Sequence, residues 1–382
     1  MLGGAFLTKG KMYDTLNKFN ALKDKENVTV LGIESSCDET AASVVRNGRE
    51  VLSSVISSQI NIHRLFGGVV PEVASRNHTL AVNNVIDEAL EKAGLSLGDI
   101  DAIAVTYGAG LVGALLVGVT SAKALSYATG IPLVKVNHIE GHISANYVAF
   151  PDLKPPFLSL VASGGHTCLI DVKDYNDFTL LGSTRDDAIG EAFDKTARLL
   201  GLPYPGGPEI DRLAKIGKNN IQFLSKKQVR EDFSLSYSGL KTAVVNYIHN
   251  ARQRGEEIVI EDVCASLTHT AVDILVDTTL KVAKGVGRDK IVLAGGVASN
   301  SYLRESLLSR GKEEGYEVLF PPPVLCTDNA VMIASRAYFS IKEVILTILY
   351  YFPPPLSTHY RPIFHLFNTD FRIPYLVLEA DL

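Results

Sequence analysis

Short apolar runs alternate along the chain with segments of helical periodicity, and the first runs flank polar turns. Val28 to Ile33 is one such run, and a second covers Ala41 to Val45 after a turn of polar residues. The same arrangement recurs at Phe157 to Ala162 and Cys168 to Val172, around the turn Ser163-Gly-Gly-His-Thr. Apolar runs of this length between small polar residues are typical of strands. The repeat predicts a duplicated α/β unit in which each half presents a turn to a shared cleft.

Helical periodicity and further apolar runs fill most of the remaining chain. In the first half we expect helices at Pro71 to Ala93 and Ala114 to Thr129, and strands at Ile100 to Thr106 and Leu133 to Val136. In the second half we expect helices at Asp186 to Leu200, Pro208 to Ile216, Leu240 to Ala251, Glu261 to Ala283, from Ser301 onward, and up to about Phe339. Strands at Lys290 to Leu293 and Glu317 to Phe320 separate the later helices. Strands alternating with helices predict sheets that are flanked by helices.

The two ends of the chain lack this pattern. Residues 1–27 are mixed and without periodicity, so we expect a flexible leader. Residues 341–382 form a divergent tail that contains Ile348-Leu-Tyr-Tyr-Phe-Pro-Pro-Pro and shows no helix-capping pattern. Neither end carries recognisable chemistry.

Composition narrows the class of protein. The 382 residues suffice for two domains, and 46% hydrophobic and 21% charged residues are ordinary for a soluble globular protein. A net charge of −5 gives no global basic field, so an RNA partner would need a local basic patch or another subunit. The four cysteines form no Cys-x-x-Cys pair, which favours a reducing compartment, and we expect the cytoplasm. No continuous apolar run reaches the roughly 18 residues of a membrane span, so no membrane partner is expected.

Two histidines four residues apart form the strongest candidate site. His138 and His142 open a predicted helix directly after a strand, and the spacing places both imidazoles on one helix face, where they could share a metal ion. A surface pair or hydrogen-bonded core rings would give the same spacing. Glu140 lies about 200° round the helix from His138 at 3.6 residues per turn. A zinc-protease helix places its glutamate directly after the first histidine, so the pattern argues against protease chemistry.

Glycine-rich turns indicate a cleft that binds a nucleotide. They occur at Ser163-Gly-Gly-His166, Gly206-Gly-Pro208 and Ala294-Gly-Gly-Val-Ala-Ser-Asn300, and such turns let backbone amides approach phosphate. Neither a P-loop nor a Gly-x-Gly-x-x-Gly dinucleotide fingerprint is present. Asp194 and Asp211 could bind ribose or amino-acid groups, although each alone is better explained by a helix cap or a solvated helix face.

Asp328 could complete a metal site of two histidines and one carboxylate, a set that leaves coordination positions open for substrate. Sequence does not place it near the histidines, because almost the whole second half lies between them. Cys326 is a softer candidate ligand, but its side chain need not face the same site.

Taken together, these residues resemble one family, the tRNA N6-adenosine threonylcarbamoyltransferases, once described as O-sialoglycoprotein endopeptidases. The segments that carry the resemblance are Gly32-Ile-Glu-Ser-Ser-Cys-Asp-Glu-Thr40, Gly68-Val-Val-Pro-Glu-Val-Ala-Ser-Arg-Asn-His78, His138-Ile-Glu-Gly-His142, Ser163-Gly-Gly-His-Thr167, Gly190-Glu-Ala-Phe-Asp-Lys195, Tyr204-Pro-Gly-Gly-Pro208, Phe233-Ser-Leu-Ser-Tyr-Ser-Gly-Leu-Lys241, Gly295-Gly-Val-Ala-Ser-Asn300 and Cys326-Thr-Asp-Asn-Ala330. They run in order from about Val28 to Phe339 and resemble the bacterial form. The leader and the tail find no match.

The resemblance implies an α/β fold like that of actin, the heat-shock chaperone ATPases and the sugar kinases, with two duplicated lobes around a central cleft. We expect the first lobe over residues 28–150 and the second over 151–340, with a last helix that could pack back on the first lobe. The resemblance also implies that His138, His142 and Asp328 hold one divalent metal ion per subunit, Fe²⁺ or alternatively Zn²⁺. The residues it implies for binding threonylcarbamoyl-adenylate are Val161, Ala162, Ser163, Gly164, Gly165, Asp194, Gly207, Asp211 and Asn300.

The implied function is transfer of the threonylcarbamoyl group from threonylcarbamoyl-adenylate to N6 of the adenosine just 3′ of a tRNA anticodon, with release of AMP. The family's pattern further implies tRNA, an actin-like paralogous subunit and a P-loop ATPase subunit as partners. Two alternatives stay open: an actin-like ATPase or sugar kinase, and a non-catalytic adenylate-binding module of the tRNA-modification complex. No general base can be assigned from the sequence.

Overall fold

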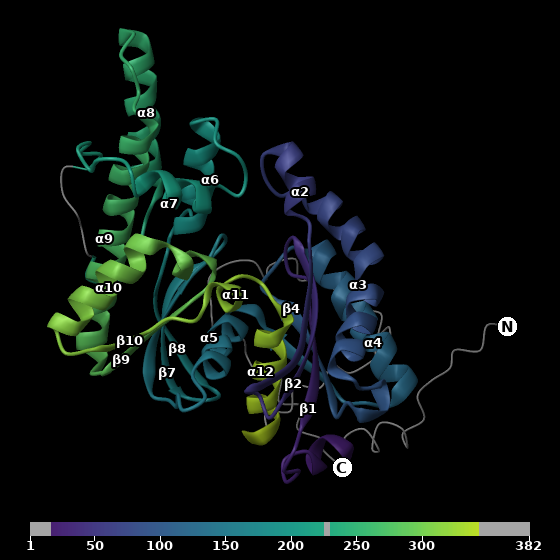
Figure 1. Ribbon diagram of the computed structural model, residues 1–382. Helices are drawn as coiled ribbons and strands as arrows, with labels where there is room; N and C mark the ends of the chain where they lie inside the picture. Colours follow the sequence, from purple (N-terminus) through teal and green to yellow (C-terminus); the bar gives the residue numbers. More distant parts are fainter. Residues whose placement is uncertain (1–16, 225–229, 344–382) are drawn as a thin grey trace, which may run out of the picture. The chain divides into compact units, whose positions relative to one another are not determined.

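Two mixed β-sheets form the framework of the computed structural model, which describes residues 17–224 and 230–343 (Figure 1). The first sheet contains β1 (Thr29–Glu34), β2 (Glu39–Arg46), β3 (Glu50–Ser58), β4 (Ala102–Gly108) and β5 (Leu133–Asn137). The second contains β6 (Phe157–Ala162), β7 (Thr167–Asp174), β8 (Asp177–Ser183), β9 (Lys290–Ala294) and β10 (Glu317–Leu319).

The two sheets have the same topology. Their strand orders are β3-β2-β1-β4-β5 and β8-β7-β6-β9-β10. In each, three antiparallel strands continue into two strands parallel to the first. This equivalence confirms the duplicated α/β unit that the repeated strand-turn-strand pattern predicts.

Helices cover both sheets. In the first half they are α2 (Ile60–His63), α3 (Pro71–Ala93), α4 (Val112–Thr129) and α5 (His138–Ala149), with the 3₁₀ turns η1 (Arg64–Phe66) and η2 (Leu97–Asp99). In the second half they are α6 (Ile189–Leu199), α7 (Gly206–Ala214), α8 (Ser238–Arg254), α9 (Ile260–Val286), α10 (Ser301–Glu313), α11 (Pro323–Cys326) and α12 (Ala330–Glu343), with the 3₁₀ turn η3 (Gly296–Ser299). Helices α3 and α4 pack side by side on one face of the first sheet (Figure 1).

Most sequence-predicted elements are present, with shifted ends. Helix α3 has the predicted bounds, whereas α6 begins at Ile189 rather than Asp186. The Asp186 carboxylate accepts hydrogen bonds from the Tyr237 amide and the Ser238 hydroxyl, so Asp186 joins the preceding loop to the start of α8 instead of entering α6. The sequence prediction omitted β3 and β8, which are the two outer antiparallel strands.

Helix α12 packs against the first sheet, although it belongs to the second half of the chain. It extends to Glu343, three residues into the expected tail, and the rest of that tail lies outside the described residues. A Cβ atom at Gly32 on β1 would lie 2.4 Å from the carbonyl oxygen of Ala330, so the helix can approach the strand only because Gly32 has no side chain. Phe19 and Leu22, from the leader, are buried in the same apolar cluster. The Lys342 ammonium donates to the carbonyl oxygen of Lys23 at 2.8 Å. The described part of the leader is therefore packed against α12.

Helix α4 has the length and mean hydropathy of a membrane-spanning helix, the one such helix among the described residues. Its sequence contains Lys123, and the helix packs on α3 and β4. Val112 and Leu116 stay largely exposed on its outer side. Exposed apolar side chains on a helix are also typical of a surface that binds another protein.

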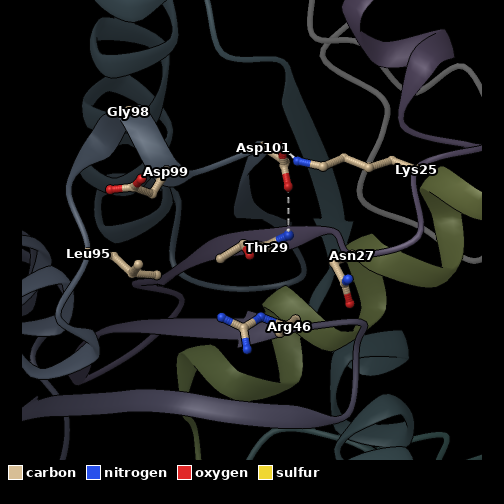
Figure 2. A pocket seen from close by; sticks show the side chains of 8 residues that line it. All are labelled: Lys25, Asn27, Thr29, Arg46, Leu95, Gly98, Asp99 and Asp101. Carbon is tan, nitrogen blue, oxygen red and sulfur yellow. Dashed lines mark hydrogen bonds and ion pairs between the residues drawn. The ribbon is translucent and has the colours of Figure 1, made fainter.

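A polar hollow lies beside the first strand (Figure 2). Its lining residues are Lys25, Asn27, Thr29, Arg46, Leu95, Gly98, Asp99 and Asp101. Asp101 accepts from the Thr29 amide at 2.9 Å and from the Lys25 ammonium at 2.5 Å, so its carboxylate already holds the chain together there. Thr29 begins β1 and Glu34 ends it, which places the hollow at the end of the strand away from the candidate histidines.

Candidate metal centre and adjoining turns

The two histidines project from the first turns of α5, which follows β5 without a loop. The Asn137 side chain caps the helix by accepting from the amides of Ile139 and Glu140, at 2.9 and 3.4 Å. This cap fixes where the helix starts and hence the direction of the first histidine. His138 and His142 are 5% and 1% exposed, with ring centroids 4.6 Å apart. The two imidazole rings therefore lie on one helix face, as the spacing of four residues predicts.

Asp328 joins the two histidines from the loop between α11 and α12. Its Oδ1 atom lies 3.5 Å from His138 Nε2 and 3.2 Å from His142 Nε2. Bonds of about 2.1 Å to a tetrahedrally coordinated ion place neighbouring ligand atoms about 3.4 Å apart. In the described part of the chain neither ring nitrogen of His142 has a hydrogen bond, although both are buried. The three side chains therefore fit a divalent metal ion that would satisfy these atoms.

The neighbouring charges in the cluster shift the pKa values of all three side chains. Burial alone would lower the pKa of His138, but the carboxylates of Asp328 and Glu34 outweigh it and raise the pKa to about 9. Burial and then the neighbouring charge of His138 lower the pKa of His142. Burial opposes ionisation of Asp328, yet His138 and His142 hold its pKa well below the ordinary value. Negative charge at this point thus favours a cation between the three groups.

Two other candidate ligands point elsewhere. The Glu140 carboxylate accepts from Arg336 Nε at 2.7 Å and takes no part in the cluster. Cys326 is fully buried, with its sulfur 3.5 Å from the carbonyl oxygen of Pro321 and 3.4 Å from Arg304. Glu140 therefore cannot act as the glutamate of a zinc-protease helix, and Cys326 is not a ligand of this site.

The first turn of the chain reaches the same cluster. Glu34, at the end of β1, lies with Oε2 3.2 Å from His138 Nδ1 and 2.5 Å from the Thr106 hydroxyl. The Ser36 hydroxyl is also 3.2 Å from His138 Nδ1. Glu34 and Thr106 are completely buried. The sequence pattern placed Glu34 and Ser36 in a turn and Thr106 at the end of a strand, but assigned none of them a role.

The second turn, Ser163 to His166, is open at its tip. Gly164 and Gly165 are exposed, and a Cβ added to either would meet no atom within 4 Å. At its base the turn is closely packed, because a Cβ at Gly190 would lie 2.6 Å from the Ser163 carbonyl oxygen. Burial, followed by the charges of His138 and His142, lowers the pKa of His166 to about 4. The charges of the metal cluster therefore reach His166, the last residue of this turn.

The structure connects the other predicted substrate residues through helix caps. Asp194 on α6 accepts from the amides of Gly206 and Gly207 at the start of α7, at 2.7 and 3.3 Å. Burial raises its pKa, although these two amides act in the opposite direction. Asp211 on α7 accepts from the Ser301 amide at 2.9 Å, and Asn300 accepts from the Leu303 amide at the same distance. The capping alternative for the two aspartates is thus realised.

Val161 and Ala162 differ from the rest of the set. They end β6, and both side chains are fully buried in the core. Only their backbone atoms could face a ligand. Gly207, in contrast, has open space where a Cβ would stand.

Tyr204 connects the second half to the first turn. Its hydroxyl lies 3.4 Å from Asp38 Oδ2, and its carbonyl oxygen accepts from Arg64 Nε at 3.0 Å. Next to Asp38, burial and then the Asp38 charge raise the pKa of Glu39 to about 9. Sequence reasoning did not identify these contacts. The sequence feature that could have indicated them is the pair of acidic residues, Asp38 and Glu39, in the turn between two apolar strands.

Comparison with known proteins extends these observations. Residues 50–335 match the family model described as tRNA N6-adenosine threonylcarbamoyltransferase. A protein of that name from Clostridium botulinum is 58% identical over 316 residues, which are 82% of this chain and 93% of the relative. A protein of the same name from Clostridium perfringens is 59% identical over 315 residues, with the same two coverages.

Solved structures show a similar fold at low identity. The T. kodakarensis HypF structure matches 83% of this chain and 47% of its own, with a TM-score of 0.56 and 15% identity. Component A of the Acidaminococcus fermentans (R)-2-hydroxyglutaryl-CoA dehydratase matches 82% of this chain and 99% of its own, with a TM-score of 0.51 and 16% identity. The expected actin-like fold is confirmed. From the family model and the relatives, the chain belongs to the tRNA N6-adenosine threonylcarbamoyltransferase family.

Proposed function

We propose that the chain transfers the threonylcarbamoyl group from threonylcarbamoyl-adenylate to N6 of the adenosine immediately 3′ of the anticodon, in tRNAs that read codons beginning with adenine. The observation that carries this function is the cluster of His138, His142 and Asp328, in a member of this family whose glycine turn at Gly164 and Gly165 is open. A bond forms between N6 and the carbamoyl carbon, and the bond from that carbon to the phosphate oxygen breaks. AMP leaves, and N6 releases one proton.

For the adenylate we propose the set expected from the sequence. Its members are Val161, Ala162, Ser163, Gly164, Gly165, Asp194, Gly207, Asp211 and Asn300. The open space at Gly164 and Gly207 supports this assignment, because a phosphate could approach the backbone amides there. Val161 and Ala162 would act through their backbone, and amides directed at the phosphate would stabilise charge on the departing AMP.

For the metal we propose Fe²⁺, with Zn²⁺ as the alternative. A set of two histidines and one carboxylate with open positions is typical of non-haem ferrous sites, and zinc accepts the same ligands. When bound, the ion supplies positive charge that polarises and orients a substrate oxygen. The chain itself holds the two substrates in reach of each other, which can provide much of the rate for a weak nucleophile such as N6.

For partners we propose tRNA, an actin-like paralogous subunit and a P-loop ATPase subunit, acting in the cytoplasm. The net charge of −5 supports a shared tRNA surface, because this chain supplies no global basic field. The neighbouring helices α3 and α4 expose Leu80, Val112 and Leu116, at 75%, 59% and 58%. Exposed apolar side chains on two neighbouring helices suit contact with another protein.

The test is transfer of labelled threonine to tRNA. Purified chain and partners are mixed with ATP, bicarbonate, a threonylcarbamoyl-adenylate synthase and a tRNA that reads codons beginning with adenine. We expect label in the tRNA and none when that adenosine is replaced by guanosine. Binding of the adenylate without transfer would instead identify a non-catalytic module. Phosphate release that needs a sugar but no tRNA would identify a kinase, an alternative that the family membership does not favour.

A further inference from the structure

Glu34 is a buried carboxylate that the proposed chemistry leaves without a role. It has no exposed surface, and among the described residues its one cationic partner is His138. A buried carboxylate without a full counter-charge is costly, so its presence here calls for an explanation. The neighbours of Glu34 provide that explanation.

Three adjacent parallel strands bring Glu34 to the metal cluster. In the register of β1 against β4, Ile33 pairs with Val105, which places Glu34 beside Thr106. In the register of β4 against β5, Thr106 pairs with Val136, two residues before His138. The carboxyl ends of parallel strands meet at one edge of a sheet, where binding sites form. The contact between Glu34 and His138 is therefore built into the sheet.

The hydrogen bonds of Glu34 determine the tautomer of His138. Glu34 Oε1 accepts from the Ser36 amide at 2.5 Å, and Oε2 accepts from the Thr106 hydroxyl at 2.5 Å. The same Oε2 lies 3.2 Å from His138 Nδ1. An ionised carboxylate can only accept, so Nδ1 must carry the hydrogen of this bond. Nε2 faces Asp328, and it is the nitrogen that can give up its proton and bind a cation while Nδ1 keeps its hydrogen bond to Glu34.

We propose that Glu34 is a positioning residue for the metal site, which fixes the ring orientation and tautomer of His138 and places a second negative charge behind the ion. This inference rests on the proposed metal site. Two carboxylates, Asp328 and Glu34, balance the charge of one divalent cation. Carboxylate partners of this kind raise the basicity of a ligating histidine, and their loss typically weakens metal affinity about 10–100-fold.

Glu34→Gln is the first test. Glutamine has the same shape, but it has one acceptor oxygen for three donors and no charge. Zn²⁺ affinity is measured by competition with a chromophoric chelator, and the Co²⁺-loaded protein is compared by its visible absorption bands. We expect Zn²⁺ affinity to fall about 10–100-fold and the Co²⁺ bands to shift. Asp171→Asn is the control, because Asp171 is equally a buried carboxylate but pairs with Arg288; its metal affinity should equal that of the wild type.

A second variant keeps the test decisive if Glu34→Gln does not fold. Glu34→Asp retains the charge but shortens the side chain by one methylene, which withdraws the carboxylate from His138. We expect an intermediate loss of Zn²⁺ affinity and a smaller metal-induced rise in Tm. Unchanged Zn²⁺ affinity and Co²⁺ bands in a variant that merely melts earlier would overturn the positioning role. Failure of the wild-type protein to bind any divalent metal would instead overturn the proposed metal site itself.

Discussion

The Tyr204 hydroxyl lies 3.4 Å from Asp38 Oδ2, which links the turn before α7 to the turn after β1. The Tyr204 carbonyl oxygen meanwhile accepts from Arg64. The segment of the second half that leads to Gly206 and Gly207 is thus held to the first half at both its side chain and its backbone.

We predict that Tyr204→Phe weakens catalysis more than folding. The phenylalanine ring keeps the packing and removes one partly buried hydrogen bond, so the free energy of unfolding should change by about 1 kcal/mol or less. If the bond holds the substrate turn in place, kcat/KM for transfer to tRNA should fall about 2–10-fold. Tyr247→Phe removes the same atom from a residue on α8 and serves as the control. Equal kcat/KM for both variants would refute a role for the Tyr204 hydroxyl.

We predict that His142→Ala removes both metal and transfer activity. Neither ring nitrogen of the buried His142 has a hydrogen bond within the described chain, and Nε2 lies 3.2 Å from Asp328 Oδ1, so the ring is placed to bind a metal ion. Zn²⁺ affinity should fall by more than about 100-fold, since a direct ligand matters more than its hydrogen-bonded partner. Titration with a chromophoric chelator measures this. His249 is an exposed histidine on α8, so His249→Ala should retain full Zn²⁺ affinity. Full Zn²⁺ affinity in His142→Ala would show that His142 is not a ligand.

The histidine pair could be predicted because its geometry is local. Two residues of one helix separated by a single turn share a face in any fold, whereas Asp328 comes from a loop whose position depends on the packing of α12 on β1. The sequence connected Asp328 to the pair only through the family resemblance. The roles of Glu34 and Thr106 depend on the register of three strands, which no local pattern encodes.

Edge position explains the strands that the sequence prediction omitted. β3 contains four serines among its nine residues, and within the described ranges one of its sides has no neighbouring strand. β8 is likewise an outer strand, and its side chains are mostly only partly buried. Both therefore lack the continuous apolar run that identifies β1 and β6. Burial creates that signal, so strands at the edge of a sheet show it weakly.

We predict that His78 makes the protein less stable as the pH falls below about 6.5. The His78 ring has no exposed surface, and burial lowers its pKa. Its Nε2 lies 2.9 Å from the Cys37 carbonyl oxygen and its Nδ1 2.7 Å from the Thr40 hydroxyl. The unfolded chain therefore binds a proton at a higher pH than the folded chain does.

For this depressed pKa, the stability from His78 is complete above about pH 6.5 and is lost as the pH falls toward the folded-state value. The slope for one proton is at most about 1.4 kcal/mol per pH unit. This pH dependence of the free energy of unfolding is measured by urea unfolding in the presence of chelator, at several pH values between 5 and 8. His78→Gln should give a shallower profile than the wild type. Parallel profiles would show that His78 keeps its ordinary pKa.

We predict that alanine at Gly295 lowers the stability of the fold, whereas alanine at Gly164 weakens adenylate binding and leaves stability unchanged. Gly295 has φ +88°, and a Cβ there would lie 2.4 Å from the Ala162 carbonyl oxygen, so Gly295→Ala should destabilise the fold by at least about 2 kcal/mol. Gly164→Ala should leave stability within about 0.5 kcal/mol, because its Cβ meets no atom. That methyl group should nevertheless weaken adenylate binding about tenfold or more by filling the open turn. Calorimetric titration with a non-hydrolysable adenylate checks this, and unaltered affinity would remove Gly164 from the substrate site.

We predict that Leu116→Glu weakens binding of the proposed paralogous subunit and leaves this chain folded. Leu116 is 58% exposed on α4, so a charged residue there should change the free energy of unfolding by less than about 0.5 kcal/mol. If α3 and α4 form the interface, desolvating the new carboxylate should weaken association at least tenfold, and transfer activity that needs the partner should fall with it. Leu308→Glu, 45% exposed on α10, is the control and should bind normally. Normal binding of both variants would place the partner on a different face, and α4 would then need another explanation for its exposed apolar residues.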